Sequence, residues 1–219
     1  MSMPRVARQL EKGYCYHLLN RGNGRARLFL DRYDYSAFMK LLAGMRAGYE
    51  VRLLAYCLMP NHFHLVLRAD ETGAVSEAMQ WAQTSYVSRF RVRYGSTGHI
   101  FQGRFRSFPI QDDEHLLTVM RYVERNPVRA NLVDSALDWR WSSRRWRGKP
   151  NDVLDESPVE LGNDWSAYVD APQTATEIAA LRRSVSRGAP FGSARWQHDA
   201  AQALGLESTL RPRGRPRKN

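Results

Sequence analysis

The spacing of apolar residues predicts alternating strands and helices along the first 110 positions. Four short runs rich in apolar and aromatic residues predict strands: residues 14–19, 51–58, 62–68 and 99–110. Between these runs, apolar positions from Asp31 to Tyr49 and from Val75 to Phe90 step by three and four, which predicts two amphipathic helices. The order strand, helix, strand, strand, helix, strand predicts an α+β fold of the ferredoxin-like kind, an antiparallel sheet with both helices on one face.

The second half of the chain adds helices that this unit does not contain. A third helix is expected from Asp112 and Asp113, which are good N-terminal residues, to about Pro127, because a proline disfavours helix in the residue before it. We expect it to cover the open face of the sheet. Residues 150–173 are acidic and contain prolines, so an irregular linker or wrap is expected there, followed by short helices at 174–187 and 193–204.

Length and composition predict one main domain with a C-terminal extension. The chain has 219 residues, of which 43% are apolar, and this is enough to bury a core without disulfides. We divide it into a main domain (1–149), an extension with the acidic linker and short helices (150–210), and a basic tail (211–219) expected to be disordered alone.

Charge indicates the class of partner. The 33 Lys and Arg residues against 22 Asp and Glu give a net charge of +11, and 29 of the basic residues are arginine. Residues 150–181 carry seven acidic groups and no Lys or Arg, so the charge is segregated along the chain. This pattern favours a nucleic acid, since guanidinium groups match phosphate geometry, although genome composition alone can also favour arginine.

Other classes are disfavoured. No apolar run approaches the 18 or so residues of a membrane span, and the first residues lack the apolar stretch of a signal peptide. Cys15 and Cys57 form no CxxC unit, and we expect two buried thiols in a reduced environment. A cytoplasmic protein with neither a membrane partner nor a small-molecule substrate is therefore expected.

The first candidate for chemistry is the pair His62 and His64 on a predicted strand. Because side chains alternate across a strand, both imidazoles share one face and can converge on a divalent metal ion. An HxH pattern alone also fits a structural role. Here Phe63, Leu65 and Leu67 supply an apolar opposite face, so packing does not require the histidines.

The second candidate is Tyr122, at the edge of the apolar stripe of the third helix. Asn126 follows one turn later, so a phenol and a carboxamide project the same way. The alternative is an amphipathic tyrosine that packs its ring and leaves its hydroxyl in solvent. Glu124 and Arg125 are expected on a solvated face.

Candidate DNA contacts lie in two segments. Arg104 and Arg106 alternate with phenylalanines, a mixture suited to phosphates and stacked bases. Asn20, Arg21 and Arg25 lie in the Gly-rich stretch leaving the first strand, where backbone could approach DNA. Solvated arginines on a strand edge or loop are the alternative for each.

The tail offers a further candidate. Arg213-Gly214-Arg215 resembles an AT-hook core that lies in a narrow, A·T-rich minor groove. A basic tail that adds only salt-sensitive affinity is the alternative.

Four segments carry a family resemblance: LMPNHFHLVLR, HIFQGRFRSFPI, RYVERNPVRANLV and WRWSS. In this order they strongly resemble the single-tyrosine transposases of the HUH nuclease superfamily, most closely the REP-associated tyrosine transposases, which act on hairpin-forming DNA. The resemblance covers roughly residues 1–147, and PFGSARW with the segment after it is similar to the C-terminal tail of that family. It implies metal ligation by His62 and His64, a nucleophile at Tyr122, and a third ligand at Asn126, where relatives often have the longer glutamine.

The resemblance implies an enzyme that nicks and rejoins single-stranded hairpin (REP-like) DNA through a 5′-phosphotyrosine. Mg²⁺ or Mn²⁺ would assist, and mixed imidazole and amide ligation suits Mn²⁺ slightly better. Single-stranded or hairpin DNA is the expected partner, and a homodimer is left open. One alternative is a catalytically weak regulator that binds DNA hairpins on the same fold. Another, a two-tyrosine or relaxase-type HUH enzyme, is disfavoured because Tyr122 has no second tyrosine one turn away.

Overall fold

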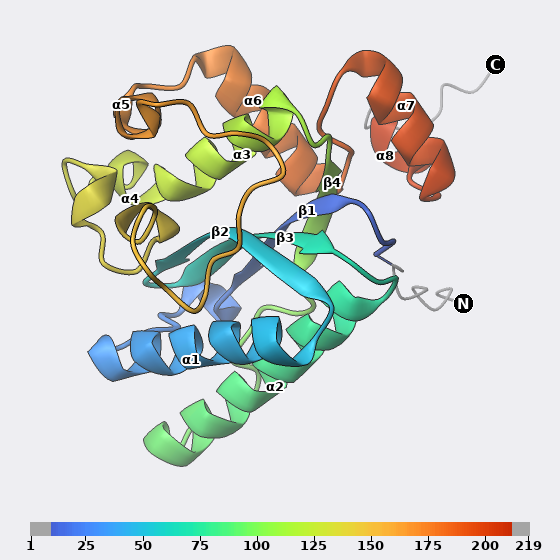
Figure 1. Cartoon of the computed structure of the whole chain (residues 1–219). Helices are drawn as coiled ribbons and strands as arrows, with labels where there is room; N and C mark the ends of the chain where they lie inside the picture. Colours follow the sequence, from blue (N-terminus) through green and yellow to red (C-terminus); the bar gives the residue numbers. More distant parts are fainter. Residues whose placement is uncertain (1–9, 212–219) are drawn as a thin grey trace, which may run out of the picture.

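Four strands form an antiparallel sheet at the centre of the chain, and the computed structural model describes residues 10–211 (Figure 1). The strands are β1 (Cys15–Arg21), β2 (Val51–Met59), β3 (His62–Ala69) and β4 (Arg106–Ile110). They lie in the order β2-β3-β1-β4, and every neighbouring pair is antiparallel. This confirms the predicted ferredoxin-like arrangement.

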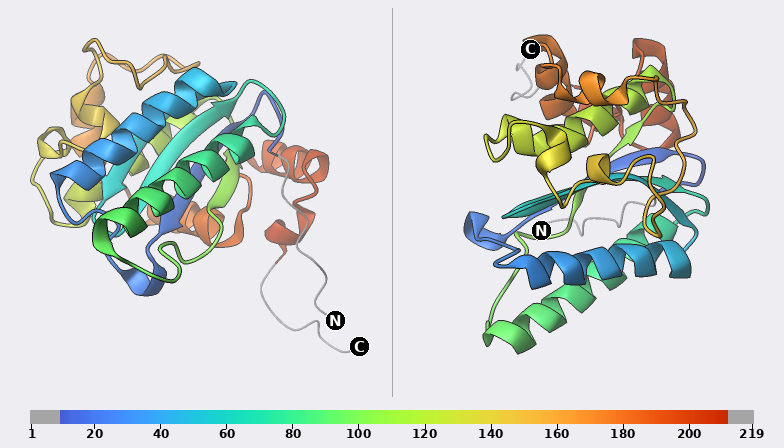
Figure 2. Two further views of the ribbon diagram at one scale, coloured as in Figure 1. Left: turned by 90° about the horizontal axis from the view of Figure 1, so that it is seen from below. Right: turned by 60° about the vertical axis from the view of Figure 1, so that its left-hand side comes forward.

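The two long helices α1 (Arg32–Gly48) and α2 (Ala74–Tyr94) cover one face of this sheet (Figure 2). Their apolar stripes pack on Phe63 and the other residues of β3 that point to the same side, in one buried cluster. Asp31 begins α1 as predicted, because its carboxylate accepts hydrogen bonds from two backbone N–H groups of the first turn.

The opposite face is covered by α3 (Glu114–Glu124), so the third helix lies where it was expected (Figure 2). Leu116, Val119 and Met120 belong to a second buried cluster with Val66 of β3 and Phe108 of β4. The sheet is therefore buried on both faces. Its α3 face holds the second histidine of the HxH pair.

Two predicted boundaries are wrong. The third helix ends at Glu124 rather than near Pro127. Pro127 instead lies in the first turn of the short helix α4 (Asn126–Arg129), where proline is tolerated. The fourth strand covers only residues 106–110 of the predicted 99–110. The residues before it form a loop, in which Phe101 makes an isolated β-bridge with Gly22, just beyond the end of β1.

The extension after residue 149 wraps around the α3 side. Its helices are α5 (Trp165–Asp170), α6 (Ala175–Arg187), α7 (Ala194–Ala203) and α8 (Glu207–Leu210). Three short 3-10 helices lie earlier in the described chain: η1 (Asn23–Arg25), η2 (Ala136–Asp138) and η3 (Ser143–Arg145). Between α6 and α7, Phe191 exchanges two backbone hydrogen bonds of 2.9 Å with Pro109 and Gln111 and so extends the sheet edge at β4. The two expected helices are confirmed as α6 and α7, whereas the irregular course expected for residues 150–173 is interrupted by α5.

Glu124 lies at the centre of the contact between α3 and the extension. The prediction of a solvated face is wrong for this residue, which is fully buried. Its carboxylate accepts hydrogen bonds from Ser143 Oγ at 2.6 Å, Arg147 Nε at 2.6 Å and Trp165 Nε1 at 2.7 Å. A buried carboxylate is tolerated because a guanidinium and two further donors replace its lost water.

Arginines spaced one helical turn apart hold the extension as well. Arg121 donates to the carbonyl oxygens of Ala171 and Pro172 at 2.8 and 3.1 Å. Arg125 donates to those of Val169 and Asp170. The helix that carries Tyr122 is therefore fixed to the extension on both sides of that residue.

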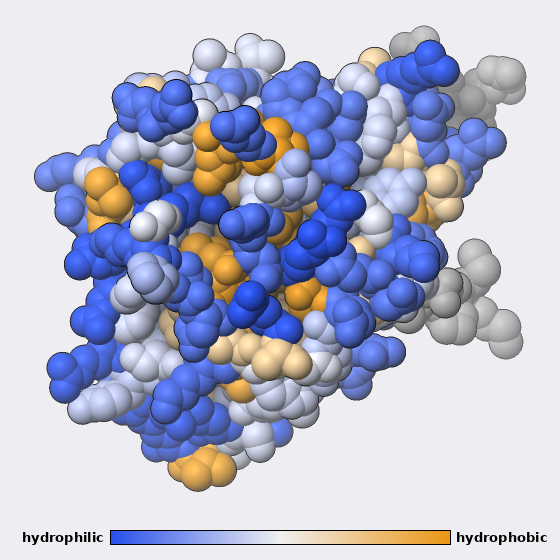
Figure 3. Space-filling model, in the orientation of Figure 1, coloured by the Kyte–Doolittle hydropathy of each residue, from blue (hydrophilic) through white to orange (hydrophobic). Residues whose placement is uncertain are grey.

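The visible surface is largely hydrophilic, as expected for a protein with many charged residues. Hydrophilic residues cover most of the face shown in Figure 3, with apolar residues visible in the gaps between them. No helix within residues 10–211 has both the length and the apolar character needed to cross a bilayer. Cys15 and Cys57 are buried and unpaired, as expected, and burial raises the pKa of the Cys15 thiol to about 12.

Candidate active site

The structure brings together the two histidines and the tyrosine that the sequence singled out. His62 and His64 point from β3 toward the α3 side, and their ring centroids are 5.0 Å apart. Tyr122, near the end of α3, places its ring 5.9 Å from the ring of His64. The geometry follows from strand alternation and from the packing of α3 on that face.

Hydrogen bonds fix the orientation of His62. Its Nδ1 lies 2.7 Å from the Asn61 side-chain oxygen, which can only accept, so Nδ1 carries the proton and Nε2 keeps its lone pair. Asn61 is itself held by a bond from its amide nitrogen to the Arg25 carbonyl. Burial lowers the pKa of His62 to about 4, with further contributions from the positive charges of Arg21 and Arg129.

His64 is also neutral. It is only 3% exposed, and burial together with the neighbouring rings and arginines places its pKa well below the ordinary value. A neutral imidazole has a free lone pair, which metal ligation requires. The electrostatics of both histidines therefore fit a metal site.

His17 is a site residue that sequence reasoning missed. It lies on β1, is 1% exposed, and its Nε2 is 2.8 Å from Nδ1 of His64. Its ring is also 4.8 Å from that of Phe108 and 6.3 Å from that of Tyr122. Only the pairing of β1 with β3, which the sequence does not state, reveals that this histidine meets the HxH motif.

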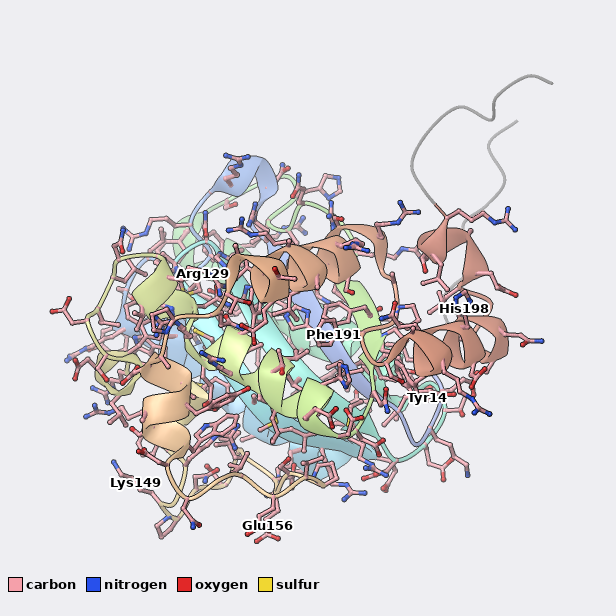
Figure 4. The ribbon with its side chains drawn as sticks, turned by 90° about the horizontal axis from the view of Figure 1, so that it is seen from above. Tyr14, Arg129, Lys149, Glu156, Phe191 and His198 are labelled. Carbon is pink, nitrogen blue, oxygen red and sulfur yellow. The ribbon has the colours of Figure 1, made fainter. Side chains whose placement is uncertain are left out.

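Asn126 and Tyr122 are joined through a second missed residue, Arg129. The guanidinium carbon of Arg129 lies 4.0 Å from the centroid of the Tyr122 ring, and its Nη2 donates to Asn126 Oδ1 at 2.6 Å. Asn126 also donates to the Tyr122 carbonyl at 3.2 Å. Arg129 reaches Gln173 at 3.4 Å, where α4 meets the start of α6 (Figure 4). The carboxamide of Asn126 thus faces a cation in this structure.

The predicted arginine contacts lie at one end of the sheet. Arg21 is the register partner of His62, and its buried Nε has no hydrogen-bond partner within residues 10–211. Arg25, Arg104 and Arg106 are exposed. These four guanidinium groups come from β1, the turn after it, the loop that leads into β4, and the first residue of β4. Arg213 and Arg215 lie outside the described residues.

Asn20 is placed differently from these arginines. It is 5% exposed, and its amide nitrogen donates to Gln83 Oε1 and to the Gly103 carbonyl, while its oxygen accepts from the backbone N–H of Arg21. All its polar atoms are engaged inside the protein. In this structure Asn20 holds the loop before β4 in place.

A second group of metal-ligand type lies at the other end of α3. Asp113, Glu114 and His115 are, within the described part of the chain, the group of such side chains whose ligand atoms lie within 4.8 Å of one another. Asp113 caps the helix, and its Oδ1 accepts from the backbone N–H of His115 at 2.9 Å and contacts Nδ1 of that residue at 2.7 Å. Ordinary N-capping accounts for this arrangement.

An antiparallel sheet that presents an HxH pair to a tyrosine on a covering helix defines the HUH class of DNA-processing proteins. Residues 11–126 match the family described as "Transposase IS200 like", and the chain belongs to this family of transposases.

One curated protein and one solved structure are similar to this chain. A Haemophilus influenzae protein described as "Putative REP-associated tyrosine transposase" is 29% identical over 106 residues, which make up 43% of this chain and 60% of that protein. The chain thus matches less than two thirds of the length of this relative. A solved structure of a REP-associated tyrosine transposase bound to a REP hairpin has the same fold, with a TM-score of 0.52 and 20% identity over 71% of this chain and 92% of that one.

Proposed function

We propose that this protein cleaves and rejoins single-stranded DNA next to a REP-like hairpin, with Tyr122 as the nucleophile. The observation that carries the proposal is the convergence of His62, His64 and Tyr122 on one face of the sheet, with rings 5.0 and 5.9 Å apart. Membership of the transposase family supports DNA cleavage as the reaction. The hairpin follows from the likeness to a transposase solved with a REP hairpin.

The donor set fits a divalent cation. His62 and His64 would hold it through Nε2, since the Nδ1 atoms are engaged by Asn61 and His17. Asn126 would be the third ligand, because a carboxamide oxygen has two lone pairs and Arg129 occupies one. When bound, Mg²⁺ or Mn²⁺ supplies Lewis-acid stabilisation of the charge that develops on the scissile phosphate.

Tyr122 performs the covalent step. Its phenol oxygen forms a bond to phosphorus, the bond from phosphorus to the 3′ oxygen breaks, the phenol loses its proton, and the departing 3′ oxygen gains one. The product is a 5′-phosphotyrosine and a free 3′-OH. Because the new ester conserves the phosphodiester energy, attack by another 3′-OH reverses the step and joins the strands without ATP.

Arginines around the site would hold the DNA backbone. Arg21 has a donor without a partner beside His62, which suits a phosphate oxygen close to the cleaved bond. Arg25, Arg104 and Arg106 continue the positive charge away from the site on exposed positions. Such contacts position the strand, and they weaken as salt concentration rises. Arg213 and Arg215 would add affinity from the tail.

The test is covalent trapping with a labelled single-stranded REP-type hairpin oligonucleotide and Mn²⁺. Wild-type protein should give a protein–DNA band on a denaturing gel, and Tyr122→Phe should give none while binding the hairpin as before. Tyr33→Phe, an exposed tyrosine of α1 on the other face of the sheet, is the matched control and should react like wild type. A band that persists in Tyr122→Phe would refute the nucleophile.

The metal is tested in the same assay. EDTA, His62→Ala and His64→Ala should each abolish the covalent band and leave hairpin affinity nearly intact, because phosphate contacts come from arginines. Full cleavage in both histidine variants would overturn the proposed ligands.

A catalytically weak hairpin-binding regulator is the second candidate. The observation that favours it is the 2.6 Å bond from Arg129 to Asn126, which places a cation at the proposed third ligand. Tight hairpin binding by wild-type protein without any covalent band in Mn²⁺ would support the regulator rather than the enzyme.

A further inference from the structure

We infer that His17 is a positioning residue that fixes the tautomer and orientation of His64 for metal binding. The inference rests on the proposed function, since it takes His64 as a metal ligand. His17 itself would touch neither the metal nor DNA. It would act through the single bond between its Nε2 and Nδ1 of His64.

The two rings are enclosed in the protein. His17 is 1% exposed and His64 is 3% exposed, so bulk solvent has little access to their 2.8 Å bond. Phe108 packs at 4.8 Å on His17 with an interplanar angle of 32°, and this contact limits rotation of the His17 ring. The partner that His64 meets at Nδ1 is therefore set by β1 and β4.

The effect of the bond depends on which of the two imidazoles donates its N–H. Each neutral imidazole has one N–H and one lone pair, so only one of the two rings can donate in this bond. If His64 donates from Nδ1, its Nε2 keeps the lone pair that a metal needs. If His17 donates instead, Nε2 of His64 carries the proton and cannot ligate. A metal site is compatible with the first arrangement alone, in which His17 is the acceptor.

His62, the neighbouring proposed ligand, is also oriented by a hydrogen-bond acceptor at its Nδ1. Nδ1 of His62 meets the Asn61 oxygen at 2.7 Å, which also leaves Nε2 free. His62 is only partly buried and uses a residue of the strand turn. His64 is 3% exposed and uses a side chain from the adjacent strand. Both histidines thus present Nε2 on the face where Tyr122 lies.

The experiment compares two replacements of His17. Phenylalanine keeps an aromatic ring beside Phe108 but offers no acceptor, whereas glutamine places an amide oxygen near the position of Nε2. We expect His17→Phe to lower Mn²⁺ affinity about 10–100-fold, the usual effect of losing such a partner, and His17→Gln to recover most of it. Mn²⁺ titration followed by electron paramagnetic resonance measures this without any cleavage assay.

A spectroscopic readout separates positioning from general support of the fold. In ¹⁵N-histidine NMR spectra of the metal-free protein, His64 should carry its proton on Nδ1 in wild type and in His17→Gln. In His17→Phe the proton should shift to Nε2 or distribute over both nitrogens. A wild-type His64 protonated on Nε2 would overturn the inference by itself, even if a variant failed to fold.

His64→Ala tests the proposed function separately from the role of His17. If this variant binds Mn²⁺ as tightly as wild type, His64 is not a metal ligand, and both the proposed function and the role of His17 are refuted. If His64→Ala loses Mn²⁺ binding and His17→Phe keeps wild-type affinity, the proposed function stands and the role of His17 is refuted.

Discussion

Replacing Glu124 by alanine removes a fully buried carboxylate that joins α3 to two later segments of the chain. The carboxylate accepts bonds from Ser143, Arg147 and Trp165. Once it is gone, Arg147 keeps its bond to the Leu54 carbonyl at 2.7 Å but has no counter-ion, and its side chain is only 10% exposed. An uncompensated guanidinium is then left inside the protein.

The size of the effect follows from that stranded charge. Removing one partner of a buried ion pair costs about 3–5 kcal/mol. For a protein of this length, each kcal/mol lowers the melting temperature by about 2–4 °C. We therefore expect the melting temperature of Glu124→Ala to fall by roughly 6–20 °C. Glu124→Gln should lose less, because its amide oxygen still accepts from Arg147, although its amide N–H groups oppose the donor of Trp165.

Urea unfolding followed by circular dichroism measures the free energy of unfolding. Glu71→Ala is the matched control, since Glu71 pairs with Lys12 at 3.7 Å with both side chains more than half exposed. Exposed pairs contribute at most about 1 kcal/mol. If Glu124→Ala were as stable as Glu71→Ala to within 1 kcal/mol, the buried carboxylate would not stabilise the fold and the reasoning would be wrong.

Three further outcomes are expected. The double variant Arg104→Gln/Arg106→Gln should weaken hairpin binding and reduce the slope of log affinity against log salt by about 0.7–0.9 per lost phosphate contact. Filter binding at several salt concentrations measures this slope, and an unchanged slope would show that these two arginines do not contact DNA phosphates. Asn20→Ala should lower the free energy of unfolding by about 1–3 kcal/mol because it leaves buried groups unpaired; lost DNA affinity with unchanged stability would instead indicate a direct contact. Deleting residues 211–219, a segment with five Arg and Lys residues, should reduce affinity and the salt slope but leave cleavage of saturating hairpin unchanged; slower cleavage at saturation would show that the tail shapes the active complex.

The fold could be predicted because its two long helices carry apolar stripes and its central strands are short apolar runs. The stripes of α1 and α2 repeat at helical spacing, and β2 and β3 flank a turn that contains proline and asparagine. The 99–105 segment shows why alternation alone is insufficient. Its sequence alternates like a strand, but the bond from Asn20 to the Gly103 carbonyl holds it as a loop.

The site could be predicted where its chemistry is local in the chain, as in the HxH pair and in Tyr122 with Asn126. His17 and Arg129 were missed because their roles depend on strand pairing and on the packing of α4 against Tyr122. Glu124 was expected in solvent because charged residues are usually exposed. Its partner Trp165 lies 41 positions later, and the residues next to Glu124 in the sequence do not indicate this contact.

The arginines that bind the extension alter what the net charge of +11 means for DNA. Arg121, Arg125 and Arg129 are one helical turn apart, and they meet a continuous row of oxygen atoms from residues 169–173. That row occupies the guanidinium groups much as the phosphates of a nucleic acid strand would. The net charge of +11 therefore overstates the number of guanidinium groups that are free to contact phosphates, because the extension already engages these three.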